Sequence, residues 1–137
     1  TIIGCETLWV IINTNKRKPE ILVLKSEHFE TFPEKYAVKS EFQKPKHLNT
    51  IINSWRKKVV LSDLDIVNHV NNIKYIEWCL DGLNAEYVLK NTFQKMEMHF
   101  LREMVWNDSV VIQEDGETFY VTKDGKNCFI MSIDKNI

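Results

Sequence analysis

The stretch SDLDIVNHVNNIKYIEW, residues 62–78, carries more information on the fold than any other part of the chain. Its first eleven residues contain two aspartates and four asparagine or histidine side chains, but no glycine. An apolar-periodic segment follows directly. Asp and Asn are favoured where a helix starts, because backbone N–H groups in the first turn have no partner inside the helix. We therefore expect a helix to begin near Val70–Asn72.

The segment after this polar stretch has the periodicity of a helix. Over residues 72–91, apolar side chains recur every three or four positions, which predicts one face of a helix of about five turns. These side chains are Ile73, Ile76, Leu80, Leu83 and Tyr87.

Strand-like segments surround this helix. One covers residues 55–61, and four more follow the helix over residues 94–104, 108–114, 117–123 and 127–134. Lys123-Asp124-Gly125-Lys126 predicts a two-residue hairpin between the last two. One strand, one long helix and a run of antiparallel strands predict the α+β class, with a curved sheet wrapped around the helix.

Residues 1–50 have a different character. The apolar run at residues 8–12 predicts a buried strand, closed by a turn at residues 13–15, and a short helix is expected near residues 26–32. A buried strand needs neighbours. We therefore expect residues 1–50 to be the terminal strand and linker of a preceding domain, and residues 51–137 to form a domain of their own.

The composition excludes several classes of function. At 137 residues, with 44% hydrophobic and 27% charged residues, the chain is of ordinary globular type and about one domain long. Its net charge of −1 gives no electrostatic reason to expect nucleic acid or an anionic membrane as a partner. No apolar run approaches the roughly 18 residues of a membrane span.

No metal or cofactor is expected from the motifs. Cys5, Cys79 and Cys128 have no metal-type spacing, and their odd number favours reduced thiols inside a cell. The four histidines are scattered, which argues against a zinc site, and the four glycines form no phosphate-binding loop.

The polar stretch does contain groups suited to hydrolysis of an acyl group. A helix N-terminus can hold a carbonyl oxygen and stabilise the oxyanion that forms when the carbonyl is attacked. Asp65 is a potential base or nucleophile, and His69 is a potential acid, base or hydrogen-bonding partner. From the residues alone an alternative stays open, in which Asp63, Asp65 or Asn68 only caps a turn or helix.

The run Asp63–Tyr75 resembles the hotdog-fold thioesterases, and most of all the acyl-acyl carrier protein thioesterases of plants and bacteria. Their signature D-L-D-x-N-x-H-V-N-N-x-K-Y-I is followed by W-x-L-[DE], and the match continues here in Ile76, Trp78, Leu80 and Asp81. Residues 8–19 resemble the last strand of the family's first hotdog domain, and residues 96–110 resemble the strand pair after the helix. The resemblance implies the C-terminal hotdog of a double-hotdog parent.

Carried over residue by residue, the resemblance implies a catalytic Asp at Asp65, a catalytic His at His69 and a later catalytic Glu at Glu103. Where the plant enzymes have a catalytic Asn, this chain has Val67. Asn68, one position later, is then the candidate for that role.

Two further positions bear on the implied mechanism. The backbone N–H groups of Val70, Asn71 and Asn72 would receive the substrate carbonyl. Met104 occupies the position sometimes assigned to a nucleophilic Cys, so a cysteine nucleophile finds no support. Water activated by Asp65 or Glu103 would attack the carbonyl, and direct attack by Asp65 through an anhydride stays open.

The function implied by the resemblance is hydrolysis of fatty acyl-acyl carrier protein thioesters, which releases free fatty acid in fatty acid biosynthesis without a cofactor. The implied partner is acyl carrier protein bearing a fatty acyl-phosphopantetheine. The chain would pair as a homodimer or with a first hotdog domain, in the bacterial cytoplasm or in a plastid. The alternatives are a non-catalytic hotdog module for carrier binding or dimerisation, and a hotdog acyl-CoA thioesterase.

Overall fold

The computed structural model describes residues 4–16, 18–21, 30, 32, 34–38, 43–45, 47–90 and 92–134. The chain divides into two compact units, Thr1–Gln43 and Lys44–Ile137. No helix among the described residues is long and apolar enough to cross a membrane.

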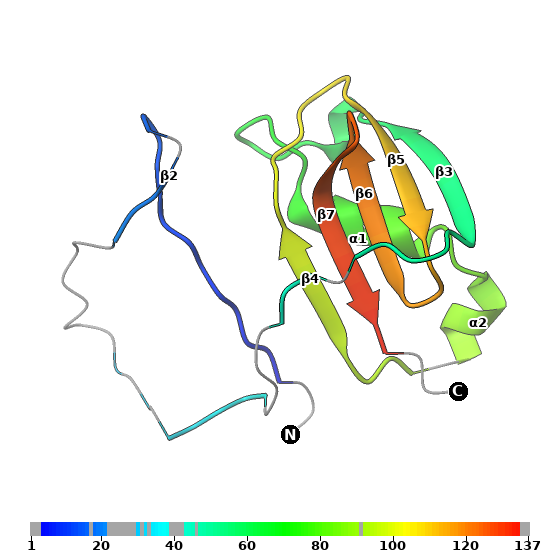
Figure 1. The fold of residues 1–137 in the computed structure, drawn as a ribbon, viewed down its shortest axis with the longest axis horizontal. Coiled ribbons are helices and arrows are strands. Elements are labelled where there is room, and N and C mark those ends of the chain that lie inside the picture. The colour runs from blue at the N-terminus through cyan, green and yellow to red at the C-terminus, as the bar shows by residue number, and fades with distance from the viewer. Residues whose placement is uncertain are drawn as a thin grey trace. The chain divides into compact units, whose positions relative to one another are not determined.

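The second unit is built on a five-stranded antiparallel sheet with the strand order β3-β5-β6-β7-β4, and helix α1 packs across one face of it (Figure 1). The strands are β3 Asn53–Lys58, β4 Met96–Phe100, β5 Ser109–Glu114, β6 Thr118–Lys123 and β7 Lys126–Ile133. A short 3-10 helix η1, Leu61–Asp63, precedes α1, Asn72–Leu80. The predicted α+β class and the run of antiparallel strands are confirmed.

The predicted hairpin between the last two strands is also confirmed. It joins β6 to β7 through Asp124 and Gly125, whose φ angles are 50° and 71°. Both residues therefore adopt the left-handed conformation that a two-residue type I′ turn requires.

The single helix predicted over residues 72–91 is wrong, because the chain forms two helices there. The first, α1, ends at Leu80, and the second, α2, spans Ala85–Lys90. Asn84 starts α2, since its side-chain oxygen accepts a hydrogen bond from the backbone N–H of Tyr87 at 3.2 Å. Helical periodicity continues across such a break, so the spacing of apolar residues did not indicate it.

A close approach of two segments accompanies this break. Gly82 lies against the indole ring of Trp55 on β3, and a Cβ atom at position 82 would overlap that ring. Glycine is therefore required at position 82 because it has no side chain to collide with the Trp55 ring.

The core lies between α1 and the sheet. The ring of Tyr75 lies 5.2 Å from that of Phe129 and 5.5 Å from that of Trp78, measured between centroids. Ile73, predicted on the buried face, is 49% exposed. The reason is geometric, because Ile73 lies about 200° around the helix from Tyr75, which faces the sheet.

In the first unit, the predicted strand at residues 8–12 is regular only from Ile12 onward. The unit contains only a short antiparallel pair among the described residues, β1 Ile12–Asn13 with β2 Lys18–Pro19. The strand predicted at residues 8–12 is not buried, and Trp9 is 82% exposed. The prediction assigns the neighbours of this strand to a preceding domain, so its burial there stays a prediction. The helix expected near residues 26–32 lies almost wholly outside the described residues.

The two compact units meet at residues 43 and 44, while the predicted division into domains at residue 50 stays a prediction. Asn49 donates its backbone N–H to the Asp115 carboxylate at 3.4 Å, and Ile52 donates to the Glu114 carbonyl at 2.7 Å. Asn49 is therefore attached to the second unit. The origin of residues 1–50 as the terminal strand and linker of a preceding hotdog domain stays a prediction.

The close approach at Gly82 generates a stability prediction. Gly82→Ala is expected to lower the free energy of unfolding by about 1–3 kcal/mol, because the added methyl group overpacks against Trp55. Urea denaturation measures this. Asp81→Ala is the matched control in the same turn, expected within about 0.5 kcal/mol of wild type because Asp81 is exposed. Equal effects of the two substitutions would contradict the prediction.

Candidate active site

The polar stretch forms a closed loop between η1 and α1. The backbone N–H of Asp65 donates to the carbonyl of His69 at 2.8 Å, and Leu64 pairs with Val70 as an antiparallel bridge. Inside the loop, Oδ1 of Asp65 accepts hydrogen bonds from the backbone N–H groups of Val67 at 2.9 Å and His69 at 3.1 Å. The Asp65 carboxylate thus caps a turn, as the structural alternative predicted. Its other oxygen, Oδ2, accepts no hydrogen bond from the described residues.

Asn68 has a conformational role in this loop. Its φ angle is 64°, a left-handed conformation that Asn adopts more readily than most residues. Its backbone N–H donates to the Asp65 carbonyl at 3.2 Å, and its side chain forms no hydrogen bond with the described part of the chain. Val67 beside it is 60% exposed. A catalytic role for Asn68 therefore stays a prediction, and the turn accounts for an Asn at this position.

The end of β4 brings a second segment to the loop. β4 ends at Phe100 and not at residue 104 as predicted. The backbone N–H groups of Leu101 and Arg102 both donate to the carbonyl of Cys128, at 2.8 and 3.1 Å. Two successive donors on one acceptor break the regular ladder with β7, so the chain leaves the sheet here.

Beyond that point the chain pairs with the polar loop. His69 and Val105 form an antiparallel bridge, and the Val70 N–H donates to the Met104 carbonyl at 2.8 Å. This pairing brings Nε2 of His69 to 3.8 Å from Oε2 of Glu103, with side-chain exposures of 38% and 59%. The contact is an ion pair when the imidazole is protonated, and it is too long for a direct hydrogen bond. Asp65, His69 and Glu103 therefore gather around one loop.

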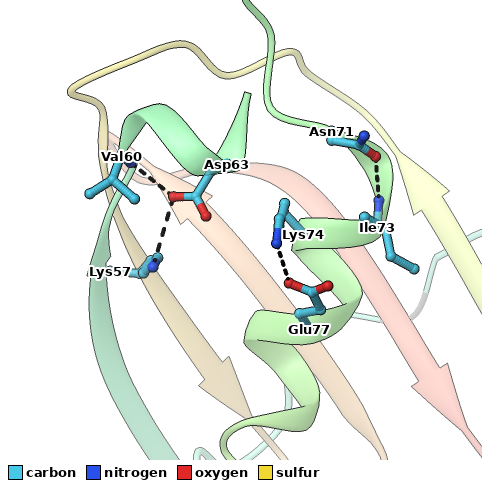
Figure 2. Close-up of polar contacts among 7 residues, drawn as sticks. All are labelled: Lys57, Val60, Asp63, Asn71, Ile73, Lys74 and Glu77. Atoms are coloured by element: carbon cyan, nitrogen blue, oxygen red, sulfur yellow. Dashed lines mark hydrogen bonds and ion pairs between the residues drawn. The ribbon is translucent and has the colours of Figure 1, made fainter. Parts of the chain in front are cut away.

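Asn71 forms the N-terminus of α1. Its side-chain oxygen accepts a hydrogen bond from the backbone N–H of Ile73 at 3.1 Å (Figure 2). The N–H groups of Val70 and Asn71 are already donated to protein carbonyls, at 2.8 and 2.9 Å. Among the described residues, the N–H of Asn72 has no such acceptor. The predicted set of three donors for a substrate carbonyl is therefore reduced to Asn72.

Sequence reasoning missed the support under the loop. Tyr75 and Met104 are buried, and burial raises the pKa of the Tyr75 phenol to about 12, which a backbone hydrogen bond with Met104 only partly offsets. Tyr75 is therefore a neutral, fixed group beneath the site. The Tyr in the family signature was the available signal, but its long-range partner is not visible in the sequence.

The buried thiols are unsuited to nucleophilic attack. Burial raises the pKa of both Cys79 and Cys128. A thiol with a raised pKa contains little of the thiolate that acts as a nucleophile. Within the described ranges, no group of three or more His, Cys, Asp and Glu side chains could hold a metal ion.

Asp108 holds the turn that carries the loop's partner strand. Its Oδ2 accepts the backbone N–H of Val105 at 3.1 Å, and its Oδ1 accepts Nζ of Lys123 at 2.6 Å. Burial raises the pKa of Asp108, but the hydrogen bonds from Lys123 and Val105 outweigh it and leave the pKa below its ordinary value. The folded state therefore favours the ionised carboxylate.

A cleft in the second unit lies away from these residues. It has a volume of about 370 Å³. Its lining consists of Asn53, Trp55, Arg56, Lys57, Trp78, Asp81 and Gly82. None of the candidate catalytic residues lines it, and it sits at the far end of α1 from Asn72. We therefore do not assign the acyl chain to it.

Comparison with known proteins places the chain in a family. Residues 46–126 match the family described as the acyl-ACP thioesterase C-terminal domain. A curated relative, the chloroplastic dodecanoyl-[acyl-carrier-protein] hydrolase of Cinnamomum camphora, is 31% identical over 115 residues, covering 78% of this chain and 29% of that protein.

Two solved structures share the fold. An acyl-ACP thioesterase from Bacteroides thetaiotaomicron gives a TM-score of 0.69 at 23% identity, covering 91% of this chain and 53% of the other. The 12:0-ACP thioesterase from Umbellularia californica gives 0.72 at 20% identity, covering 91% and 52%. The predicted hotdog fold is confirmed. The chain spans about half the length of these two proteins.

The left-handed turn generates a prediction for Asn68. If its role is conformational, Asn68→Gly should retain stability and activity, because glycine adopts a positive φ without strain. Asn68→Ala should lower the free energy of unfolding by about 1–2 kcal/mol. Urea denaturation and thioester hydrolysis would be measured on both variants. Equal loss of activity in both, at retained stability, would instead assign the side chain a catalytic role.

The lowered pKa of Asp108 generates a pH prediction. Asp108→Asn is expected to cost about 1.5–3 kcal/mol of unfolding free energy at neutral pH, through loss of hydrogen bonds to a charged group. The stabilisation exists above the unfolded carboxyl pKa of about 3.9 and disappears as pH falls through the lower folded pKa. The difference between wild type and variant should therefore close in acid. Asp81→Asn, an exposed control, should show no such difference.

Proposed function

The chain belongs to the acyl-ACP thioesterase family, and from this membership we propose that the whole protein hydrolyses fatty acyl-acyl carrier protein thioesters and releases free fatty acid. The observation that carries the proposal is the approach of His69 Nε2 to Glu103 Oε2, 3.8 Å apart, beside the start of α1. This distance is too long for a direct hydrogen bond or a tight ion pair. A water molecule bound near both groups would contact each of them.

The proposed reaction uses three groups. The thioester carbonyl oxygen binds at the N–H of Asn72, where the partial positive charge of the α1 N-terminus stabilises the oxyanion. Water attacks the carbonyl carbon and transfers its proton to Glu103, assisted by His69. The C–S bond then breaks, and the departing thiolate takes the proton from Glu103 and leaves as the carrier's thiol, which restores the Glu103 carboxylate. Water thus supplies the hydroxyl of the fatty acid.

Asp65 has a different part in this proposal. Its Oδ1 holds the N–H groups of Val67 and His69, which orients the His69 backbone. Its Oδ2 faces no donor among the described residues. Activation of water by Asp65 and direct attack through an anhydride therefore stay as alternatives to Glu103.

We further propose that a second hotdog unit pairs along β4. Among the described residues this strand pairs only with β7, and its side chains Met98 and Phe100 are exposed. A free, apolar strand edge is a template for pairing with another chain or domain. The unit is either a preceding domain or a second copy, and it would cover the open surface around His69. Acyl carrier protein is the second partner, and the bacterial cytoplasm or a plastid is the proposed place of action.

One observation favours a second candidate function. Val67 occupies the position of a catalytic Asn in the family signature, and its exposed, apolar side chain cannot hydrogen-bond a reacting group. This supports a hotdog module that binds acyl carriers or dimerises without turnover. Parallel assays with acyl-acyl carrier protein and acyl-CoA separate three possibilities: an acyl-acyl carrier protein thioesterase, an acyl-CoA thioesterase and a binding module. The binding module would leave both thioesters intact.

The geometry predicts which carboxylate matters for hydrolysis. Glu103→Gln and His69→Ala should each lower kcat/KM by about 10²–10⁴-fold, the usual contribution of general acid–base catalysis. The kcat/KM of the double variant should be no lower than that of the less active single variant, because the two groups act as a unit.

The chain offers a matched control on β4, the strand that precedes Glu103. Glu97 Oε1 lies 3.2 Å from His99 Nε2, so Glu97→Gln removes a carboxylate beside a histidine away from the loop. Its kcat/KM should stay within about threefold of wild type. Hydrolysis of acyl-acyl carrier protein would be followed by release of the free thiol. Full activity of Glu103→Gln, or an equal loss in Glu97→Gln, would refute the assignment.

A further inference from the structure

We infer that Asp63 is a positioning residue that holds the catalytic loop, residues 64–71, in its working shape; this rests on the proposed hydrolase function. Asp63 is 4% exposed, which is unusual for an aspartate. It is the first Asp of the polar stretch, and it contacts neither His69 nor Glu103. Its effect on the reaction must therefore pass through the loop.

The side chain of Asp63 fixes the entry to the loop. Its Oδ2 accepts a hydrogen bond from the backbone N–H of Val60 at 2.8 Å and lies 3.8 Å from Nζ of Lys57 (Figure 2). Both partners belong to the segment that begins with β3. The carboxylate thereby ties η1 back onto the end of that strand.

The backbone of Asp63 fixes the exit from the loop. Its carbonyl accepts the N–H of Asn71 at 2.9 Å, and Asn71 in turn caps α1 through Ile73. The residues before and after the loop are thus joined at a single buried position. Asp65 and His69, which lie between them, are held by a loop with both ends pinned.

The ion pair of Asp63 extends this support to the helix. Nζ of Lys57 lies 5.6 Å from the centroid of the Trp78 ring, and Trp78 is buried on α1. Lys57, which is part of β3, therefore contacts both η1 and α1. A buried carboxylate left without its partners costs several kcal/mol, so the arrangement favours one geometry of these three elements over others.

A charged group at this position has a consequence that an apolar one would not have. Its two functions, accepting the Val60 N–H and pairing with Lys57, need the carboxylate in one orientation. Both contacts run through Oδ2, so Asp63→Asn preserves the size and one acceptor oxygen for the Val60 N–H but removes the negative charge that pairs with Lys57. We expect the loop to loosen while the core remains packed.

The test compares Asp63→Asn with Asp115→Asn in the full-length protein. Asp115 is a matched control, because its carboxylate also accepts a backbone N–H, from Thr118 at 3.0 Å. It directly follows the last residue of β5, Glu114. Asp63→Asn should lower kcat about 10²-fold with KM within about threefold, because misplacement by about 1 Å costs that much. Amide hydrogen exchange over residues 64–71 should accelerate, while exchange in β6 and β7 should not.

Lys57→Met serves as a second variant if Asp63→Asn does not fold. It leaves an apolar side chain on the Trp78 side but removes the cation that pairs with Asp63, and it should lower kcat by about two- to fivefold, as expected for a partly exposed ion pair. It should accelerate exchange over residues 64–71 in the same way.

Each outcome decides the inference. A lower kcat at nearly unchanged KM, together with faster amide exchange over residues 64–71, supports the inference. It is overturned if Asp63→Asn matches Asp115→Asn in kcat, or if exchange over residues 64–71 is unchanged in a folded variant. If the wild-type protein hydrolyses no thioester, the proposed function fails, and the exchange measurement alone then decides whether Asp63 holds the loop.

Discussion

The candidate site depends on one backbone contact, the hydrogen bond from the Val70 N–H to the Met104 carbonyl with the adjoining bridge between His69 and Val105. It joins two segments more than thirty residues apart, the polar loop before α1 and the chain that leaves β4. Without it, His69 and Glu103 would belong to unrelated surfaces. A buried backbone donor left unpaired is costly, so this pairing is held firmly.

The surrounding structure supports this contact in two ways. Tyr75 and Met104 pack beneath it in the core, so the segments cannot move inward. The Asp108 carboxylate, held by Lys123, fixes the turn after Val105. The site thus lies on ordered backbone at the edge of a packed domain, which suits a reaction that needs groups held in place.

The errors in sequence interpretation share one physical origin. The spacing of apolar residues indicates which side chains can share a face, but it does not indicate a turn that interrupts a helical pattern. It therefore continued the helix past Leu80, where Gly82 packs on Trp55 and Asn84 starts a new helix. In the same way, the apolar run at residues 8–12 predicted a longer strand than the structure has, since β1 spans only Ile12–Asn13. Local signals were reliable where the chemistry is local, as in the type I′ hairpin at Asp124 and Gly125.

By itself, the sequence determined the α+β class, the strands of the meander, the family and the identity of Asp65, His69 and Glu103 as candidates. These follow from side-chain spacing and from a short, specific signature, both of which are properties of the linear chain. Only the tertiary structure decided which groups meet and which are occupied. It brought Glu103 to His69, and it consumed the N–H groups of Val70 and Asn71 in protein hydrogen bonds. Such assignments arise from backbone pairing between distant segments, which no local pattern encodes.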